Sequence, residues 1–138
     1  MCVRIIINMD FPDDEIKNGI ASLLKLESSQ ICFVYDWEIN IDDKYLVYCE
    51  RIMRKGGFPL QLIIYRAEKF IDISEFGRFC DEFCALMNCS VLISDEKLNP
   101  FSWILIDDQK NHYQAYLDID KLNGEEEELE IKTFFRLK

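Results

Sequence analysis

The sequence has little glycine, proline or histidine. Its 138 residues include five glycines, three prolines and one histidine. No G-x-G-x-x-G or Walker pattern occurs, so a phosphate-binding loop is not expected. The single histidine, His112, lies in an expected turn, where most histidines are surface residues rather than catalytic bases. Because no Ser-His-Asp or Cys-His arrangement is evident at close spacing, we expect no catalytic residues and no enzyme activity.

Long hydrophobic runs are also missing. No apolar run reaches the roughly 18 residues of a membrane-spanning helix. The opening stretch "MCVRIIINMD" reaches Asp10 before the apolar region of a secretory signal could form. Both absences lead us to expect a cytoplasmic protein that does not enter a membrane.

The six cysteines do not follow a metal-binding or disulfide pattern. There is no C-x-x-C, and Cys80 and Cys84 lie one helical turn apart on an apolar stripe. A structural zinc site needs four ligands, usually in closely spaced pairs. A chain of this size can fold around its own apolar core without disulfides. We therefore expect reduced, buried thiols, no metal and no cofactor.

Acidic residues outnumber basic ones by 26 to 16, which gives a net charge of −10. Such a field repels phosphate backbones and anionic lipids, so direct binding to nucleic acid or membranes is not expected. Residues 94–130 contain eleven acidic and three basic residues. The last eight residues contain three basic residues and no acidic one. The charge would steer a basic partner toward the acid-rich segment.

Hydrophobic periodicity predicts alternating strands and helices. Strands are expected at 3–9, 31–37, 60–67, 90–94, 102–107 and 113–119. Helices are expected at 13–27, with acids in the first turn, and at 74–88. The order predicts one α+β domain over residues 1–138, in which a mixed sheet carries three helices and ends in a C-terminal β-meander.

Two segments are harder to assign. "Leu-Val-Tyr" at 46–48 is compatible with a strand, but the apolar residues at 45, 48, 49, 52 and 53 recur at helical spacing. Basic residues and Gly56-Gly57 follow, as at a helix end, so we predict a third helix over 45–55. In the tail, 125–128 favours a helix start and 131–135 favours a strand, with a final strand preferred.

The hairpin at 102–119 combines aromatic and acidic residues. Trp103 and Leu105 share one side of the first strand, and Ile104 and Ile106 share the other. Because both sides are apolar, this strand should be covered on both faces, with Trp103 in the interior. The turn acids Asp95, Glu96, Asp107 and Asp108 are expected to be exposed.

The segments "LMNCSVLISDE", "LNPFSWILID" and "YQAYLDID" together resemble small bacterial immunity proteins of contact-dependent growth-inhibition and polymorphic toxin systems. The similarity covers about a third of the chain and contains no catalytic signature. It implies a cytoplasmic antidote that binds and neutralises one cognate toxin domain, which in such systems is frequently a basic nuclease. The resemblance transfers no contact residue.

Charge and expected exposure, rather than a motif, select the candidate partner-binding residues. They are the acids of the C-terminal segment together with one aromatic anchor: Asp95, Glu96, Phe101, Asp107, Asp108, Asp118, Asp120, Glu125 and Glu126. Two other classes stay open. A small-ligand-binding or regulatory module would show a large internal cavity, and an enzyme would show a buried carboxylate pair or an accessible thiol of low pKa.

Overall fold

The computed structural model describes residues 2–35, 45–66, 73–124 and 127–137. Eight strands in this part of the chain form one mixed sheet in the order β10-β8-β7-β6-β1-β5-β3-β2. All neighbours pair antiparallel except β2 and β3, which are parallel. The elements are β1 (Cys2–Ile7), α1 (Asp13–Leu24), η1 (Ser28–Gln30), β2 (Ile31–Phe33), β3 (Val47–Met53), β4 (Lys55–Gly56), β5 (Leu60–Arg66), α2 (Ile73–Met87), β6 (Val91–Ser94), β7 (Ser102–Ile106), β8 (His112–Leu117), α3 (Ile119–Leu122), β9 (Glu128–Leu129) and β10 (Ile131–Arg136).

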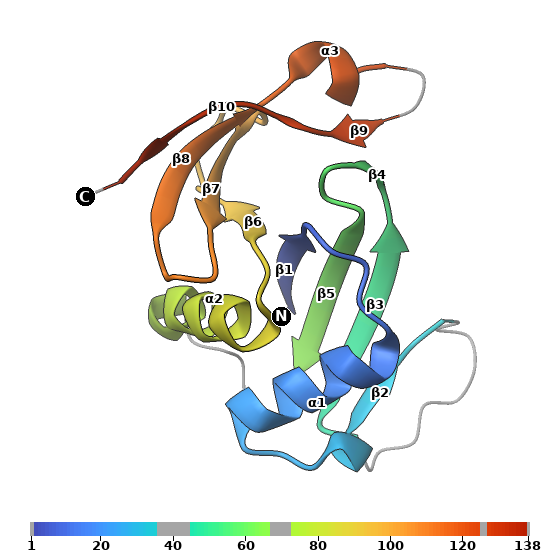
Figure 1. Cartoon of the computed structure of the whole chain (residues 1–138). Helices are drawn as coiled ribbons and strands as arrows, with labels where there is room; N and C mark the ends of the chain where they lie inside the picture. Colours follow the sequence, from blue (N-terminus) through green and yellow to red (C-terminus); the bar gives the residue numbers. More distant parts are fainter. Residues whose placement is uncertain (1, 36–44, 67–72, 125–126, 138) are drawn as a thin grey trace.

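The larger core lies between the sheet and the two long helices. Ile5 and Ile7 of β1 point into it and are fully buried. Helix α1 contributes Ile16 and Ile20 at helical spacing, and α2 contributes an apolar stripe that includes Phe83. Figure 1 shows α1 and α2 together on one face of the sheet.

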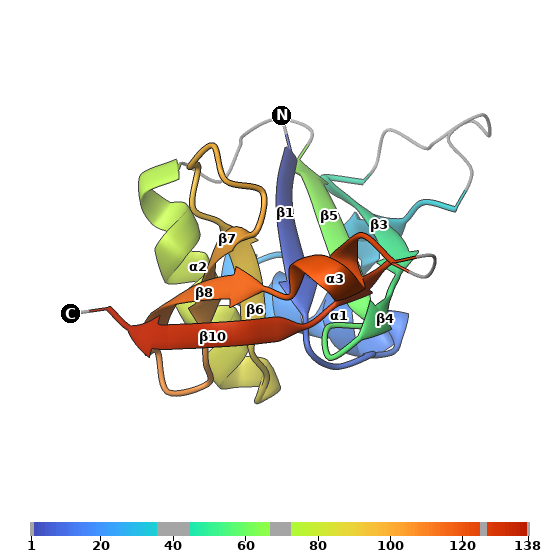
Figure 2. The same ribbon diagram turned by 90° about the horizontal axis from the view of Figure 1, so that it is seen from above.

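A second, smaller core covers the opposite face. Ile6 of β1 points into it, and the C-terminal strands add Leu105, Ala115 and Leu117. The sheet bends strongly, since β8 and β10 run across the direction of β1 and β5 (Figure 2). Strand β7 is covered on both faces, as predicted, because its Ile106 belongs to the larger core and its Leu105 belongs to the second core. Trp103 is only partly buried against the second core, and its Nε1 donates to the Pro100 carbonyl at 2.9 Å.

The α+β class, the mixed sheet and the C-terminal meander are confirmed. The predicted helix at 13–27 is α1, which ends when Lys25 turns into the left-handed region at φ 58°. The predicted helix at 74–88 is α2, and Asn88 at φ 52° ends it. Strand β2 ends at Phe33, and the last residues of its predicted range, 36 and 37, lie outside the described residues.

The predicted helix over 45–55 is wrong, because residues 47–53 form strand β3. Val47 and Cys49 alternate into the core and are fully buried. Strand β3 pairs with β5 along its whole length and with β2 on its other side. The pairing on both edges outweighs the end signals of a helix. Gly56 is not a helix cap, but the second residue of the short strand β4, with φ 98°.

The C-terminal region contains both kinds of structure. The preferred final strand is confirmed as β10. The third helix of the domain is the short α3, which the sequence did not predict, and its Leu122 packs on the second core. Across the described residues, no helix has the length and apolar character needed to span a membrane.

Candidate partner-binding surface

Asp95 organises the loop between β6 and β7. Its Oδ2 accepts hydrogen bonds from Ser102 Oγ and from Gln114 Nε2, the latter at 3.1 Å. Its Oδ1 accepts from the Lys97 backbone N–H at 3.0 Å. Desolvation raises the pKa of Asp95, but these hydrogen bonds together outweigh it and lower the pKa below its usual value. Asp95 is thus half-buried rather than exposed as predicted, and it fixes the loop.

Asp107 has the same role in the β7–β8 turn. Its Oδ1 accepts from the backbone N–H groups of Gln109 and Asn111, both at 2.9 Å. Its Oδ2 accepts from the Tyr113 hydroxyl at 2.9 Å. Desolvation raises the pKa of Asp107, but these bonds, led by that from the Asn111 backbone, together outweigh it and lower the pKa below its usual value. Asp107 is half-buried, so the expectation that it is exposed is also wrong.

Asp118 caps α3. Its Oδ1 accepts from the backbone N–H groups of Asp120 at 3.0 Å and Lys121 at 3.3 Å. The cap satisfies N–H groups that have no partner inside a helix. Asp118 therefore holds the chain in place directly after β8.

An exposed acid lies close to each of these three structural aspartates. Glu96 follows Asp95, Asp108 follows Asp107, and Asp120 lies two residues after Asp118, all with exposed side chains. In each loop one carboxylate orders the backbone and another faces solvent. The exposed charges are consequently held on ordered backbone before any partner binds.

The structure separates the predicted residues into two places. Strands β7 and β8 pair from Ser102↔Tyr116 to Ile106↔His112. The loop before β7 and the residues after β8 therefore share one end of the hairpin, where the Leu117 N–H donates to the Phe101 carbonyl at 2.8 Å. Asp107 and Asp108 lie at the other end, about 15 Å away along a five-residue strand.

The first of these ends also exposes apolar side chains that the sequence reasoning did not select. Leu98 is 103% exposed and Ile119 is 51% exposed, whereas the predicted anchor Phe101 is half-buried. We name Glu96, Leu98, Phe101, Ile119 and Asp120 the acidic end surface. The sequence alone does not show that Leu98 is exposed, because an apolar residue in a charged loop can also fold back into the core. The predicted residues Glu125 and Glu126 lie outside the described residues.

Cys32 and the four buried cysteines, Cys49, Cys80, Cys84 and Cys89, are unpaired thiols. Burial raises the pKa of Cys49 to about 12 and also raises that of Cys80. A hydrogen bond with Cys89, together with burial, raises the pKa of Cys84. A raised pKa disfavours the thiolate, which is the nucleophilic and metal-binding form. In the described part of the chain, no group of three or more potential metal ligands gathers.

His112 is not in the turn, but is the first residue of β8. Its Nε2 lies 2.5 Å from Asp81 Oδ1 of α2. Sequence spacing could not reveal this contact, because the two residues are 31 positions apart. The contact joins α2 to the hairpin close to the Asp107 turn.

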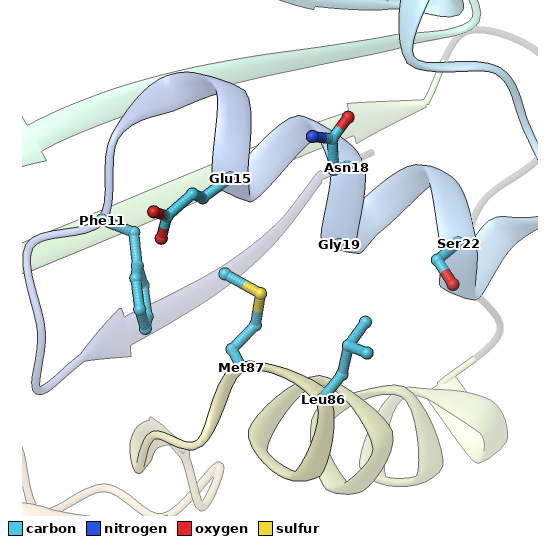
Figure 3. Close-up of a pocket in the computed structure, with 7 residues that line it drawn as sticks. All are labelled: Phe11, Glu15, Asn18, Gly19, Ser22, Leu86 and Met87. Carbon is cyan, nitrogen blue, oxygen red and sulfur yellow. The ribbon is translucent and has the colours of Figure 1, made fainter.

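A groove of about 350 Å³ lies between α1 and α2 (Figure 3). One wall is the polar side of α1, with Glu15, Asn18 and Ser22, and the other carries Leu86 and Met87 of α2. At the floor, a Cβ added to Gly19 would lie 2.9 Å from Met87 Sδ, so the helices approach closely there. This is an open surface groove rather than the internal cavity that would favour a ligand-binding module.

Comparison of the chain with protein-family models, with curated proteins and with solved structures gave no match. The resemblance to immunity proteins thus stays a prediction.

Proposed function

We propose that this chain is a non-catalytic, acidic immunity protein that binds and neutralises a cognate toxin domain in the cytoplasm. The partner would be a domain with a basic surface, such as a nuclease. The acidic end surface is the observation that supports the proposal. It combines exposed carboxylates with exposed apolar side chains on backbone that Asp95 and Asp118 hold in place.

Each component has a distinct physical role. Clustered carboxylates accelerate the encounter with a basic surface, and this steering weakens as salt screens the charges. Leu98 and Ile119 would then enter apolar pockets of the partner and slow dissociation. Because the loop is already ordered, little conformational entropy is lost on binding.

The test first asks whether a gene beside this one encodes a basic toxin domain, and then uses that domain, purified in a form without toxic activity. We expect a complex whose association rate falls markedly as salt rises, measured by stopped-flow mixing. Glu96→Lys combined with Asp120→Lys should slow association, whereas Leu98→Ala combined with Ile119→Ala should mainly speed dissociation. Co-expression with the active domain should show protection of the host cells.

The control reverses two exposed acids at the start of α1, Asp14→Lys and Glu15→Lys, which makes the same change in net charge. If this pair slows association as much as the first, the acidic end surface is not the site and only net charge matters. If the neighbouring domain neither binds nor is neutralised, the proposed function is wrong.

The alternative, a small-ligand-binding or regulatory module, would hold its ligand in the groove between α1 and α2, although this groove is open to the surface and is not the internal cavity expected for such a module. A groove of about 350 Å³ is within the usual size range of ligand sites. Native mass spectrometry of freshly purified protein distinguishes the two. A retained small molecule, lost in the groove-filling variant Ser22→Trp, would favour the module over the immunity protein.

A further inference from the structure

Strand β10 ends the eight-stranded sheet, and among the strands that the structure describes it pairs with β8 alone (Figure 2). Its Phe134 and Phe135 are 58% and 55% exposed. Each ring contacts one tyrosine of β8: Tyr113 and Phe134 have centroids 5.5 Å apart, and Tyr116 and Phe135 have centroids 6.4 Å apart. Both rings nevertheless leave more than half of their surface in solvent. An edge strand with exposed aromatic side chains is a template for pairing with another strand.

The backbone register shows which groups of β10 are free. The Leu137 N–H donates to the His112 carbonyl at 2.8 Å. Thr133 pairs with Tyr116 and Phe135 with Gln114 in the same register. Because hydrogen-bonding direction alternates along a strand, Thr133 and Phe135 point their backbone groups at β8. The N–H and C=O groups of Phe134 and Arg136 consequently point away from the sheet.

Charge favours this strand as the place where two copies of the chain could meet. The chain has a net charge of −10, yet residues 131–138 contain basic residues and no acid. Two acidic molecules repel each other least where their surfaces are least acidic. The same basic strand would repel a strongly basic partner such as the proposed toxin.

We propose that β10 pairs antiparallel with β10 of a second copy of this chain, joining two sheets into one across a two-fold axis. This inference goes beyond the proposed function and does not depend on it. The dimer would be isologous, with the same strand contributed by both copies.

The side chains select one register for this pair. A two-fold axis at Phe134 would set Lys132 opposite Arg136 of the other copy, and directly opposed like charges are destabilising. An axis at Phe135 instead sets Phe134 opposite Arg136 on one face, a favourable cation–π pair. This axis also sets Lys132 against Lys138 of the other copy, but Lys138 lies two positions after the last residue of β10, so like charges oppose only past the end of the strand. On the other face the two Phe135 residues meet as a non-hydrogen-bonded pair, with Cα atoms about 4.5 Å apart.

This register also satisfies the free backbone groups. Phe134 and Arg136 are the residues whose N–H and C=O groups point outward, and each such pair would exchange both of its hydrogen bonds. The Arg136 guanidinium donates to Asn111 Oδ1 at 2.6 Å within the chain, so it would have to turn from this acceptor to cover Phe134 of the second copy. A single strand on each side buries less area than a standard interface of roughly 800 Å² per partner, so the dimer should be weak.

Sedimentation equilibrium of the whole chain tests the proposal. The average mass should rise from 16.4 kDa toward twice that value as concentration increases. Added salt should strengthen the dimer, since it screens the repulsion between two acidic chains. Amide hydrogen exchange should show protection of Phe134 and Arg136 that grows with concentration, whereas that of Phe135 stays constant.

A pair of variants isolates the backbone bond. Phe134→Ala removes the ring and keeps the outward N–H, whereas Phe134→Pro removes both without breaking a bond to β8. The proline variant should be monomeric and the alanine variant should dimerise more weakly than the wild type. Circular dichroism checks that each variant is folded. Phe135→Ala, which keeps every backbone bond but removes the ring at the two-fold axis, should also dimerise more weakly than the wild type.

Met53→Ala is the control, because Met53 is 54% exposed and lies on β3, far from β10 in the strand order. It should dimerise as the wild type does. A mass that stays at 16.4 kDa at the highest concentration would overturn the proposal. The proposal would also be overturned if Phe134→Pro and Phe134→Ala dimerised equally well, or if Met53→Ala weakened the dimer as much as Phe134→Pro does.

Discussion

Asp95 is a residue whose carboxylate is needed by buried donors. Ser102 and Gln114 are 5% and 3% exposed, and both donate to Asp95. Gln114 Nε2 also lies 2.7 Å from Ser102 Oγ and 3.1 Å from the Trp103 carbonyl, so the network connects β7, β8 and the loop before them. An acid chosen as a partner contact is thereby also a structural residue.

Asp95→Ala should lower the free energy of unfolding by about 1–3 kcal/mol, because it leaves buried donors without their acceptor. Glu96→Ala, its exposed neighbour, should change stability by less than about 0.5 kcal/mol. Urea unfolding of the two variants measures the difference. Equal losses would show that the network contributes nothing specific.

The lowered pKa values of Asp95 and Asp107 predict how stability depends on pH. A carboxylate whose folded pKa lies below its unfolded value of about 3.9 stabilises the fold fully above that value. This contribution is lost as pH falls through the folded pKa. Asp95→Asn and Asp107→Asn should therefore each flatten the fall in unfolding free energy below about pH 4. The exposed Asp108→Asn is the comparison, and an equally flat profile for it would contradict the assignment.

At the scale of elements, β9 adds Leu129 to the second core and lies beside the short strand β4, whose two residues are exposed. They pair in parallel through Lys55↔Glu128 and Gly56↔Leu129. Gly56 has φ 98°, and a Cβ there would lie 2.9 Å from the Leu129 carbonyl oxygen. The pair therefore depends on a residue without a side chain.

Gly56→Ala should destabilise the protein by roughly 1–3 kcal/mol, since it combines a left-handed backbone with a contact to backbone. Gly77→Ala is the matched change inside α2, where a Cβ would meet nothing within 4 Å. Alanine favours the helix there, so this variant should gain about 0.5–1 kcal/mol. Thermal unfolding of both proteins gives the sign of each change in stability, and a stabilised Gly56→Ala variant would refute the strain at Gly56.

At the scale of the whole molecule, the sheet separates two cores, and the larger one encloses most of the described thiols. Cys49, Cys80 and Cys84 are fully buried between the sheet and its helices. Their raised pKa values and lack of solvent contact should make them unreactive until the domain unfolds.

Iodoacetamide labelling followed by peptide mass spectrometry checks this. In native protein at neutral pH, peptides with Cys49, Cys80 and Cys84 should stay unmodified, and all three should react in urea. The half-buried Cys32 serves as an internal comparison for partial access. Rapid native labelling of Cys80 or Cys84 would show that the helix layer opens readily.

Local sequence patterns predicted the helices and strands whose own residues are enough to indicate their conformation. Helices α1 and α2 have an apolar stripe and a clear end, and β1, β5 and β7 have β-branched runs covered on two faces. Segment 45–55 was mistaken for a helix because its apolar residues satisfy helical spacing. Only the neighbours β2 and β5, distant in sequence, make the strand more stable.

The candidate site was predictable as composition, but not as geometry. The acid-rich segment 94–130 is evident from the composition of the sequence. The sequence could not show that Asp95, Asp107 and Asp118 accept bonds within the chain, because such bonds depend on loop conformation. The exposure of Leu98, Phe134 and Phe135 follows from where the sheet ends, which no local pattern reveals.

The sequence by itself determined the α+β class, the net charge and the acid-rich C-terminal segment, because composition and short-range periodicity are properties of neighbouring residues. Tertiary structure alone decided which acids are free, which strand forms the sheet edge and how the hairpin ends are separated. Those features depend on pairing between segments far apart in the chain, where register and burial are set by the fold as a whole.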